Sequence, residues 1–213
     1  MTTLAHGERL ALADLLTEVG PDAPTLCGDW TTRELAAHLA SRERRPDALP
    51  GVAISALAWH TDSLRRSYAK RPYAALVEQF RSGPGHLSFF ALPGADRMFN
   101  GTEHVVHHED VRRAQPGWQP RDLPLRVQDS LWKAVTSRAP LSFHGLDSRV
   151  VLRRSDRPEV EHTVHRSGDN EVTLTGEPME LLLFAFGRRD HARVDVTGDP
   201  AAVAELAASS LAA

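Results

Sequence analysis

Three histidines and one glutamate crowd a short stretch of the chain, and these residue types suit metal binding. Glu103 and His107 form an E-x-x-x-H pattern, and His104 and His108 repeat the same spacing of four residues. On a helix, residues four apart lie on one face, with their Cβ atoms about 5–6 Å apart. Either pair could therefore offer two ligands to one divalent ion, although an ordinary Glu–His surface pair has the same spacing.

A third candidate ligand, His38, comes from an earlier predicted helix. His38 shares a helical face with Leu35 and Leu39, so its imidazole should point partly toward the interior. A buried polar ring without a partner costs about 1–3 kcal/mol, so His38 needs either a backbone carbonyl or a shared ion. A metal shared with Glu103 and His107 would supply that partner, and the cores of helical bundles are regular places for such sites.

The elements that would position these residues are helical over the first two thirds of the chain. The pattern Thr31 to Glu34 is a capping box, in which the Thr31 hydroxyl would meet the Glu34 amide and the Glu34 side chain would reach back. Asn100 and Glu103 form a second cap-like pair. Helical periodicity predicts helices over about 12–19, 32–45, 73–80, 100–114 and 124–135, with loops over 48–55 and 82–97.

After Pro140 the hydrophobic pattern changes from helical spacing to alternation. Strands are expected at about 149–153, 160–165, 171–175 and 192–196, and helices at 178–186 and 200–206. Helices followed by a segregated sheet indicate the α+β class. We therefore predict two domains, a metal-binding helical bundle over residues 1–138 and a small α+β domain over residues 142–213.

The composition excludes several classes of function. The 213 residues carry a net charge of −3, which gives no basic field to hold nucleic acid or an anionic membrane. One cysteine allows no intrachain disulfide and no thiolate cluster, as expected in a reducing cytoplasm. The first 16 residues lack the apolar core of a signal peptide, and no stretch approaches the ~20 apolar residues of a membrane span. We therefore expect a cytoplasmic protein.

Residues 26–39 and 103–114 carry two motifs that resemble the mycothiol-dependent maleylpyruvate isomerase family, part of the DinB-like metal-binding superfamily. The first is a Cys-x-x-Trp-Thr stretch that runs into a helix with a histidine ligand. The second is E-x-x-x-H, which supplies the other two ligands in that family. The resemblance implies His38, Glu103 and His107 as metal ligands. It therefore favours the pair Glu103 and His107 over the pair His104 and His108.

The resemblance extends over nearly the whole chain. Segments 172–176, 180–183 and 186–188 resemble the sterol-carrier-protein-like domain that follows the bundle in that family, and residues 107–114 resemble an actinobacterial branch of it. The resemblance implies a DinB-like four-helix bundle followed by a small sterol-carrier-protein-like α+β domain.

Two histidines and one glutamate, with the remaining positions open, form a ligand set found in catalytic zinc sites. Zinc is our first expectation, and nickel, iron or cobalt also suit these ligands. A bound metal lowers the pKa of a bound water or thiol. The resemblance implies mycothiol as that thiol, which would attack an electrophilic small molecule in a transferase or isomerase reaction. A non-catalytic metal- and ligand-binding module and a metal-dependent hydrolase are the alternatives.

Several neighbouring residues have two interpretations each. Arg112 is our candidate for binding the thiol cofactor or an anionic substrate, since arginine grips carboxylates with a planar fork; the other interpretation is an ordinary salt bridge. Asp110 could orient a ligand imidazole, or be a solvated acid paired with Arg113. Cys27 is expected to be a small buried residue rather than the nucleophile, and Trp30 a core residue. The sequence leaves the catalytic residues unassigned.

Overall fold

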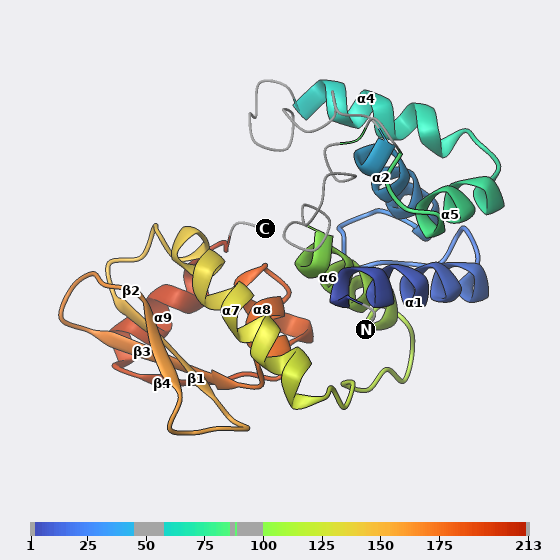
Figure 1. The fold of residues 1–213 in the computed structure, drawn as a ribbon. Helices are drawn as coiled ribbons and strands as arrows, with labels where there is room; N and C mark the ends of the chain where they lie inside the picture. The colour runs from blue at the N-terminus through green and yellow to red at the C-terminus, as the bar shows by residue number, and fades with distance from the viewer. Residues whose placement is uncertain (1–2, 45–57, 86–87, 89–99, 212–213) are drawn as a thin grey trace. The chain divides into compact units, whose positions relative to one another are not determined.

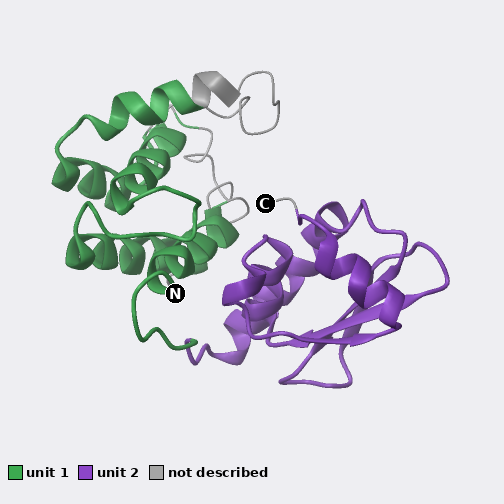
Figure 2. Ribbon diagram, turned by 180° about the vertical axis from the view of Figure 1, so that it is seen from behind, with its two compact units in different colours: residues 1–120 green, residues 121–213 purple. Residues whose placement is uncertain are grey.

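The structure, a computed structural model, describes residues 3–44, 58–85, 88 and 100–211 (Figure 1). The predicted loop over 48–55, and most of the one over 82–97, lie outside these residues. The chain divides into two compact units, Met1–Pro120 and Arg121–Ala213 (Figure 2). None of the described helices is both long and apolar enough to cross a membrane.

The described part of the first unit is helical. Its helices are α1 (Leu4–Val19), α2 (Thr32–Arg44), α4 (Ala58–Ala69), α5 (Tyr73–Arg81) and α6 (Gly101–Arg112). The periodicity predicted four of them, and α4 is the one it missed. Gly20 ends α1 with a φ of 79°, a conformation that costs glycine little, and its N–H donates to the Leu16 carbonyl.

The start of α2 follows the capping box in part. The Thr31 N–H donates to the Glu34 carboxylate over 3.1 Å, as predicted. The Thr31 hydroxyl, which was expected to accept from the Glu34 amide, instead donates to the same carboxylate. The carboxylate therefore satisfies two donors at the first turn of the helix that carries His38.

The core of this unit lies between α1, α2 and α5. Its largest fully buried apolar side chains come from these three helices, two from each: Leu12, Leu16, Leu35, Leu39, Leu76 and Phe80. Full burial of such a side chain stabilises a fold by about 1.5–3 kcal/mol. Helix α6 packs against α1 and adds Val111 to the same cluster, so the core fixes both helices that carry the candidate ligands.

The second unit is a four-stranded sheet with helices. Its elements are α7 (Leu125–Ser142), β1 (Arg149–Arg154), β2 (Glu161–His165), β3 (Glu171–Gly176), α8 (Pro178–Ala185), the short 3₁₀ helix η5 (Arg189–His191), β4 (Asp195–Gly198) and α9 (Pro200–Ala208). The strand order is β2-β1-β3-β4, with β1 parallel to β3 and the outer pairs antiparallel. The predicted α+β class is confirmed, although β4 begins three residues later than expected.

Helix α7 lies in the second unit, whereas the sequence pattern predicts it in the bundle, with the boundary between residues 138 and 142. Its buried face packs on α8 and β2. The Gln128 side chain donates to Glu177 over 2.8 Å and accepts from the Met179 N–H over 3.2 Å, which ties α7 to the start of α8. Every residue of α8 is buried, so α8 needs a covering layer of this kind.

This packing predicts how fragments of the chain behave. A fragment of residues 121–213 should fold alone and unfold cooperatively on heating. A fragment of residues 139–213 should not, because the loss of α7 exposes the apolar surface of α8. Circular dichroism shows whether each fragment is folded, and thermal unfolding shows whether it unfolds cooperatively. A stable, cooperative 139–213 fragment would return the boundary to the position expected from the sequence.

Candidate metal centre

Helices α2 and α6 bring the three predicted ligands together. His38 Nε2 lies 3.4 Å from Glu103 Oε1, and His107 Nε2 lies 3.5 Å from the same oxygen. The three ligand atoms all lie within 4.8 Å of one another. Each side chain keeps some exposure, between 13% and 27%, so none of the three is fully enclosed by the protein.

The spacing of these atoms fits a divalent ion. Tetrahedral coordination at about 2.1 Å separates two ligand atoms by about 3.4 Å. The distances from Glu103 Oε1 to the two imidazole nitrogens are 3.4 and 3.5 Å. A set of two imidazoles and one carboxylate also matches the chemistry of a catalytic zinc site. The three side chains therefore fit a divalent metal ion, and metal binding itself stays a prediction.

The charges around Glu103 favour its ionised form. Burial opposes this, but hydrogen bonds with His107 and His38, together with the Arg42 guanidinium, hold the pKa of Glu103 well below its ordinary value of 4.5. Arg42 Nε lies 3.3 Å from Glu103 Oε1. Glu103 is thus a carboxylate at neutral pH, as a metal ligand must be.

The two candidate histidines differ in their titration. Burial lowers the pKa of His38 below 6.5, so the neutral ring that can bind a metal is favoured. Burial acts in the same direction on His107, but hydrogen bonds with Asp110, Cys27 and Glu103 outweigh it and hold the pKa of His107 well above 6.5. A proton on His107 therefore competes with an ion at neutral pH.

Arg42 lies at the site and was not among the residues expected there. It follows His38 by four residues on α2, which is the signal that could have found it. Its guanidinium donates to the Asn100 side chain. Asn100 makes no side-chain cap to α6, contrary to the cap-like pair expected with Glu103. Instead Asn100 is buried and donates to Glu43 over 3.3 Å.

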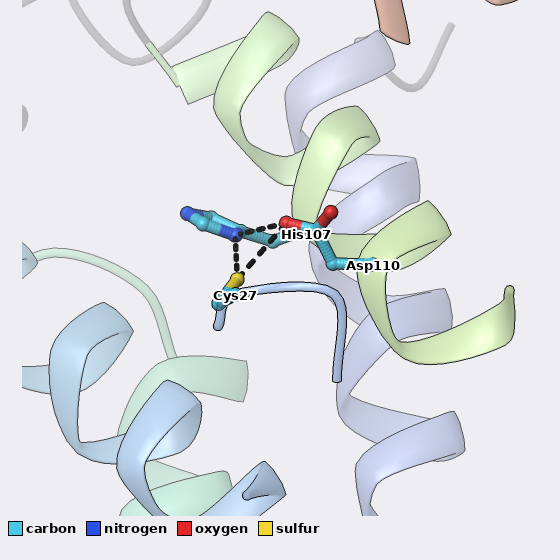
Figure 3. A group of neighbouring side chains, drawn as sticks. All are labelled: Cys27, His107 and Asp110. Carbon is cyan, nitrogen blue, oxygen red and sulfur yellow. Dashed lines mark hydrogen bonds and ion pairs between the residues drawn. The ribbon is translucent and has the colours of Figure 1, made fainter. Parts of the chain in front are cut away.

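The second nitrogen of His107 faces a different group (Figure 3). His107 Nδ1 lies 3.0 Å from Asp110 Oδ2 and 3.6 Å from Cys27 Sγ, and the Cys27 thiol donates to Asp110 Oδ2 over 3.1 Å. Asp110 is fully buried, and Arg113 donates to Glu109 over 2.6 Å. The expectation that Asp110 is a solvated acid is therefore wrong.

The other pair on α6, His104 and His108, contacts side chains and backbone of neighbouring helices. His104 Nε2 lies 2.9 Å from Glu43 Oε1 and its Nδ1 lies 3.0 Å from the Ala5 carbonyl. His108 Nδ1 lies 2.8 Å from Glu8 Oε2. Among the described residues, no group of three or more metal-binding side chains includes either histidine. The two rings thus point to separate acids instead of a shared ion.

Arg112 lies beyond the cluster along α6. Its guanidinium donates to Glu109 over 3.0 Å and to the Gln119 carbonyl over 3.0 Å. The salt-bridge interpretation therefore has direct support, and the cofactor-binding role stays a prediction. Trp30 packs against the core, as expected, and its ring centre also lies 5.4 Å from that of His38.

The fold and the clustered side chains define a two-unit α+β protein with a candidate metal centre in its helical unit. Residues 3–88 match the family model described as the mycothiol maleylpyruvate isomerase N-terminal domain. The family resemblance is thereby confirmed. The matched range contains His38 and ends before Glu103 and His107. No curated protein sequence matches the chain.

Two solved structures have a similar fold. One is described as the crystal structure of the mycothiol-dependent maleylpyruvate isomerase, with a TM-score of 0.60 and 16% identity. The other is a histidine-to-alanine mutant described by the same enzyme name, with a TM-score of 0.64 and 16% identity. In both comparisons the alignment covers 92% of this chain and 96% of the other. At this identity the likeness shows the fold alone.

The raised pKa of His107 predicts how metal binding depends on pH. Binding should release a proton at neutral pH and tighten as pH rises, until the pH exceeds the pKa of His107. In the metal-free protein, the same group stabilises the fold below pH 6.5, and this contribution is lost as pH rises through the raised pKa.

Calorimetric titration of Zn²⁺ in two buffers of different ionisation enthalpy counts the protons released. The matched control is His108→Ala, which should release the same number as the wild type. Binding without proton release at neutral pH would contradict this account of His107.

Proposed function

We propose that this chain binds a divalent metal ion and acts as a mycothiol-dependent transferase or isomerase on an electrophilic small molecule. The observation that carries the proposal is the cluster of His38, Glu103 and His107, whose ligand atoms lie within 4.8 Å of one another. The family match and the similar folds support mycothiol as the thiol. Zinc is the first choice of metal, and nickel, iron and cobalt are the alternatives.

A divalent ion at this site would drive a coordinating thiol toward its thiolate, the nucleophile that such a reaction needs. The charge states of His38 and Glu103 favour the binding of such an ion. The lowered pKa of His38 favours a neutral imidazole, and Glu103 supplies a negative charge that offsets part of the charge of the ion. Arg42 holds the Glu103 carboxylate from the side.

The proposal includes the finer assignments of the two units. The first unit is a DinB-like bundle and the second a sterol-carrier-protein-like domain, in the cytoplasm. The supporting observations are the family match over residues 3–88 and the four-stranded sheet with its α8 and α9 helices.

The metal site is tested by two histidine variants on the same helix. The wild-type protein should carry about one divalent ion per chain, since three ligands on one protein define one site. His107→Ala should lose most of the metal, while His108→Ala should retain it, because His108 contacts Glu8 instead of the cluster. Elemental analysis of the purified proteins, with thermal unfolding to confirm that each is folded, measures this. Full metal content in both folded variants would overturn the site.

The thiol assignment is tested by calorimetry of mycothiol against the metal-loaded protein. We expect binding that weakens as pH falls, since protons compete for the thiol and for His107. If Arg112 holds a carboxylate of the cofactor or substrate, Arg112→Ala should weaken binding about tenfold to a hundredfold and leave the metal in place. The matched comparison is Arg42→Ala, which should raise metal affinity, because it removes a positive charge that lies 3.3 Å from Glu103 Oε1.

No heat of mycothiol binding at millimolar concentration, in either of two buffers, would overturn the transferase or isomerase proposal. A protein that still held its metal would then be a non-catalytic module. Turnover of an ester or amide without any thiol would instead favour the hydrolase.

A further inference from the structure

The imidazole of His107 faces a different partner with each of its two nitrogens. Nε2 lies 3.5 Å from Glu103, on the side of the candidate metal ligands. Nδ1 lies 3.0 Å from Asp110 Oδ2, on the opposite edge of the ring. The second edge belongs to a cluster of Cys27, His107 and Asp110, drawn in Figure 3, whose donor atoms also lie within 4.8 Å of one another.

The distances in this second cluster are those of hydrogen bonds. A zinc ion held at about 2.0–2.3 Å would separate its tetrahedral ligand atoms by about 3.3–3.6 Å. The carboxylate of Asp110 lies closer than that to both neighbours, 3.0 Å from His107 Nδ1 and 3.1 Å from Cys27 Sγ. A carboxylate that accepts one N–H and one S–H explains both distances without an ion.

We propose that Asp110 is a positioning residue that fixes the tautomer of His107, with the Cys27 thiol as the second donor that holds Asp110 in place. A proton kept on Nδ1 leaves the lone pair of Nε2 directed at the side of Glu103 and His38. A metal-binding histidine commonly donates its other N–H to a carboxylate in this way, which fixes the ring and makes it a better ligand. The metal-dependent part of the proposal rests on the proposed function.

The position of Cys27 is fixed by its backbone. The Leu26 N–H donates to the Asp110 carbonyl over 3.0 Å, and the Cys27 N–H donates to the Thr25 hydroxyl over 3.1 Å. The loop before α2 is thus attached to α6 at Asp110, and this places the thiol beside the carboxylate. In this arrangement the Cys27 thiol acts as a hydrogen-bond donor to Asp110 beside the centre.

The tautomer is measured in the metal-free protein, so this test does not depend on the metal. Nitrogen-15 NMR of the histidine rings, at a pH at which His107 is neutral, should show the proton on Nδ1. In Asp110→Asn this preference should disappear, because the amide can pair with either form of the ring. A proton on Nε2 in the wild type would overturn the proposal.

Metal affinity is the second readout. Asp110→Asn should weaken zinc binding about tenfold to a hundredfold. The matched control is Glu109→Gln, which removes the neighbouring buried carboxylate that pairs with Arg113. It should destabilise the fold and leave the zinc affinity of the folded protein unchanged. Equal losses of affinity in the two variants would reduce Asp110 to a structural residue and overturn the proposal.

Cobalt substitution tests the role of Cys27. The wild-type Co²⁺ protein should lack the near-ultraviolet absorption of a sulfur-to-cobalt charge transfer. Cys27→Ser, which keeps a donor for Asp110, should bind zinc within about threefold of the wild type, and Cys27→Ala should bind it more weakly. A charge-transfer band that disappears in Cys27→Ser would make Cys27 a ligand and overturn its role as a donor.

The outcomes separate this inference from the proposed function. If the protein binds no metal yet keeps the Nδ1 proton on His107, and loses it in Asp110→Asn, the proposed function fails and the positioning role of Asp110 stands. If metal binds and the tautomer is the opposite one, the proposed function stands and this inference fails.

Discussion

Helix α6 buries more ionisable side chains than apolar ones, and each of these needs a partner. An ion taken out of water without one costs several kcal/mol. His104 meets Glu43, and His108 meets Glu8, both at hydrogen-bond distance. Once these pairs are made, α6 cannot turn about its axis without breaking them. The neighbouring face of the helix, which is about 100° around the axis and carries the candidate ligand pair, is thereby held toward His38.

The same pairs explain how far the sequence could predict the site. The spacing of four residues depends only on helical geometry, so it identified both candidate pairs on α6. The choice between them depends on acids that lie 61 and 100 residues earlier in the chain, which meet His104 and His108 only in the folded bundle. The contact of the Cys27 thiol with Asp110 could not be predicted for the same reason, because Asp110 lies 83 residues further along the chain.

The fold shows the same division between local and long-range information. Alternation and periodicity locate β1, β3 and most helices to within a few residues, because these patterns follow from how each element buries one face. The spacing of apolar residues in α7 does not indicate which of the two units the helix packs against. That depends on Gln128, whose amide contacts both Glu177 and Met179 at the start of α8.

The guanidinium of Arg42 lies 3.3 Å from the Glu103 carboxylate, so any cation bound by Glu103 sits beside a fixed positive charge. Like-charge repulsion opposes every ion there by a similar amount, whatever its identity. Magnesium and calcium, which bind mainly through charge and prefer several oxygen ligands, have little to offset it. Zinc, nickel and cobalt gain more from imidazole nitrogen and can offset the repulsion. Arg42 would thus weaken the binding of every divalent ion without changing their order of affinity, and the weakest binders, magnesium and calcium, would be the first to leave the site empty.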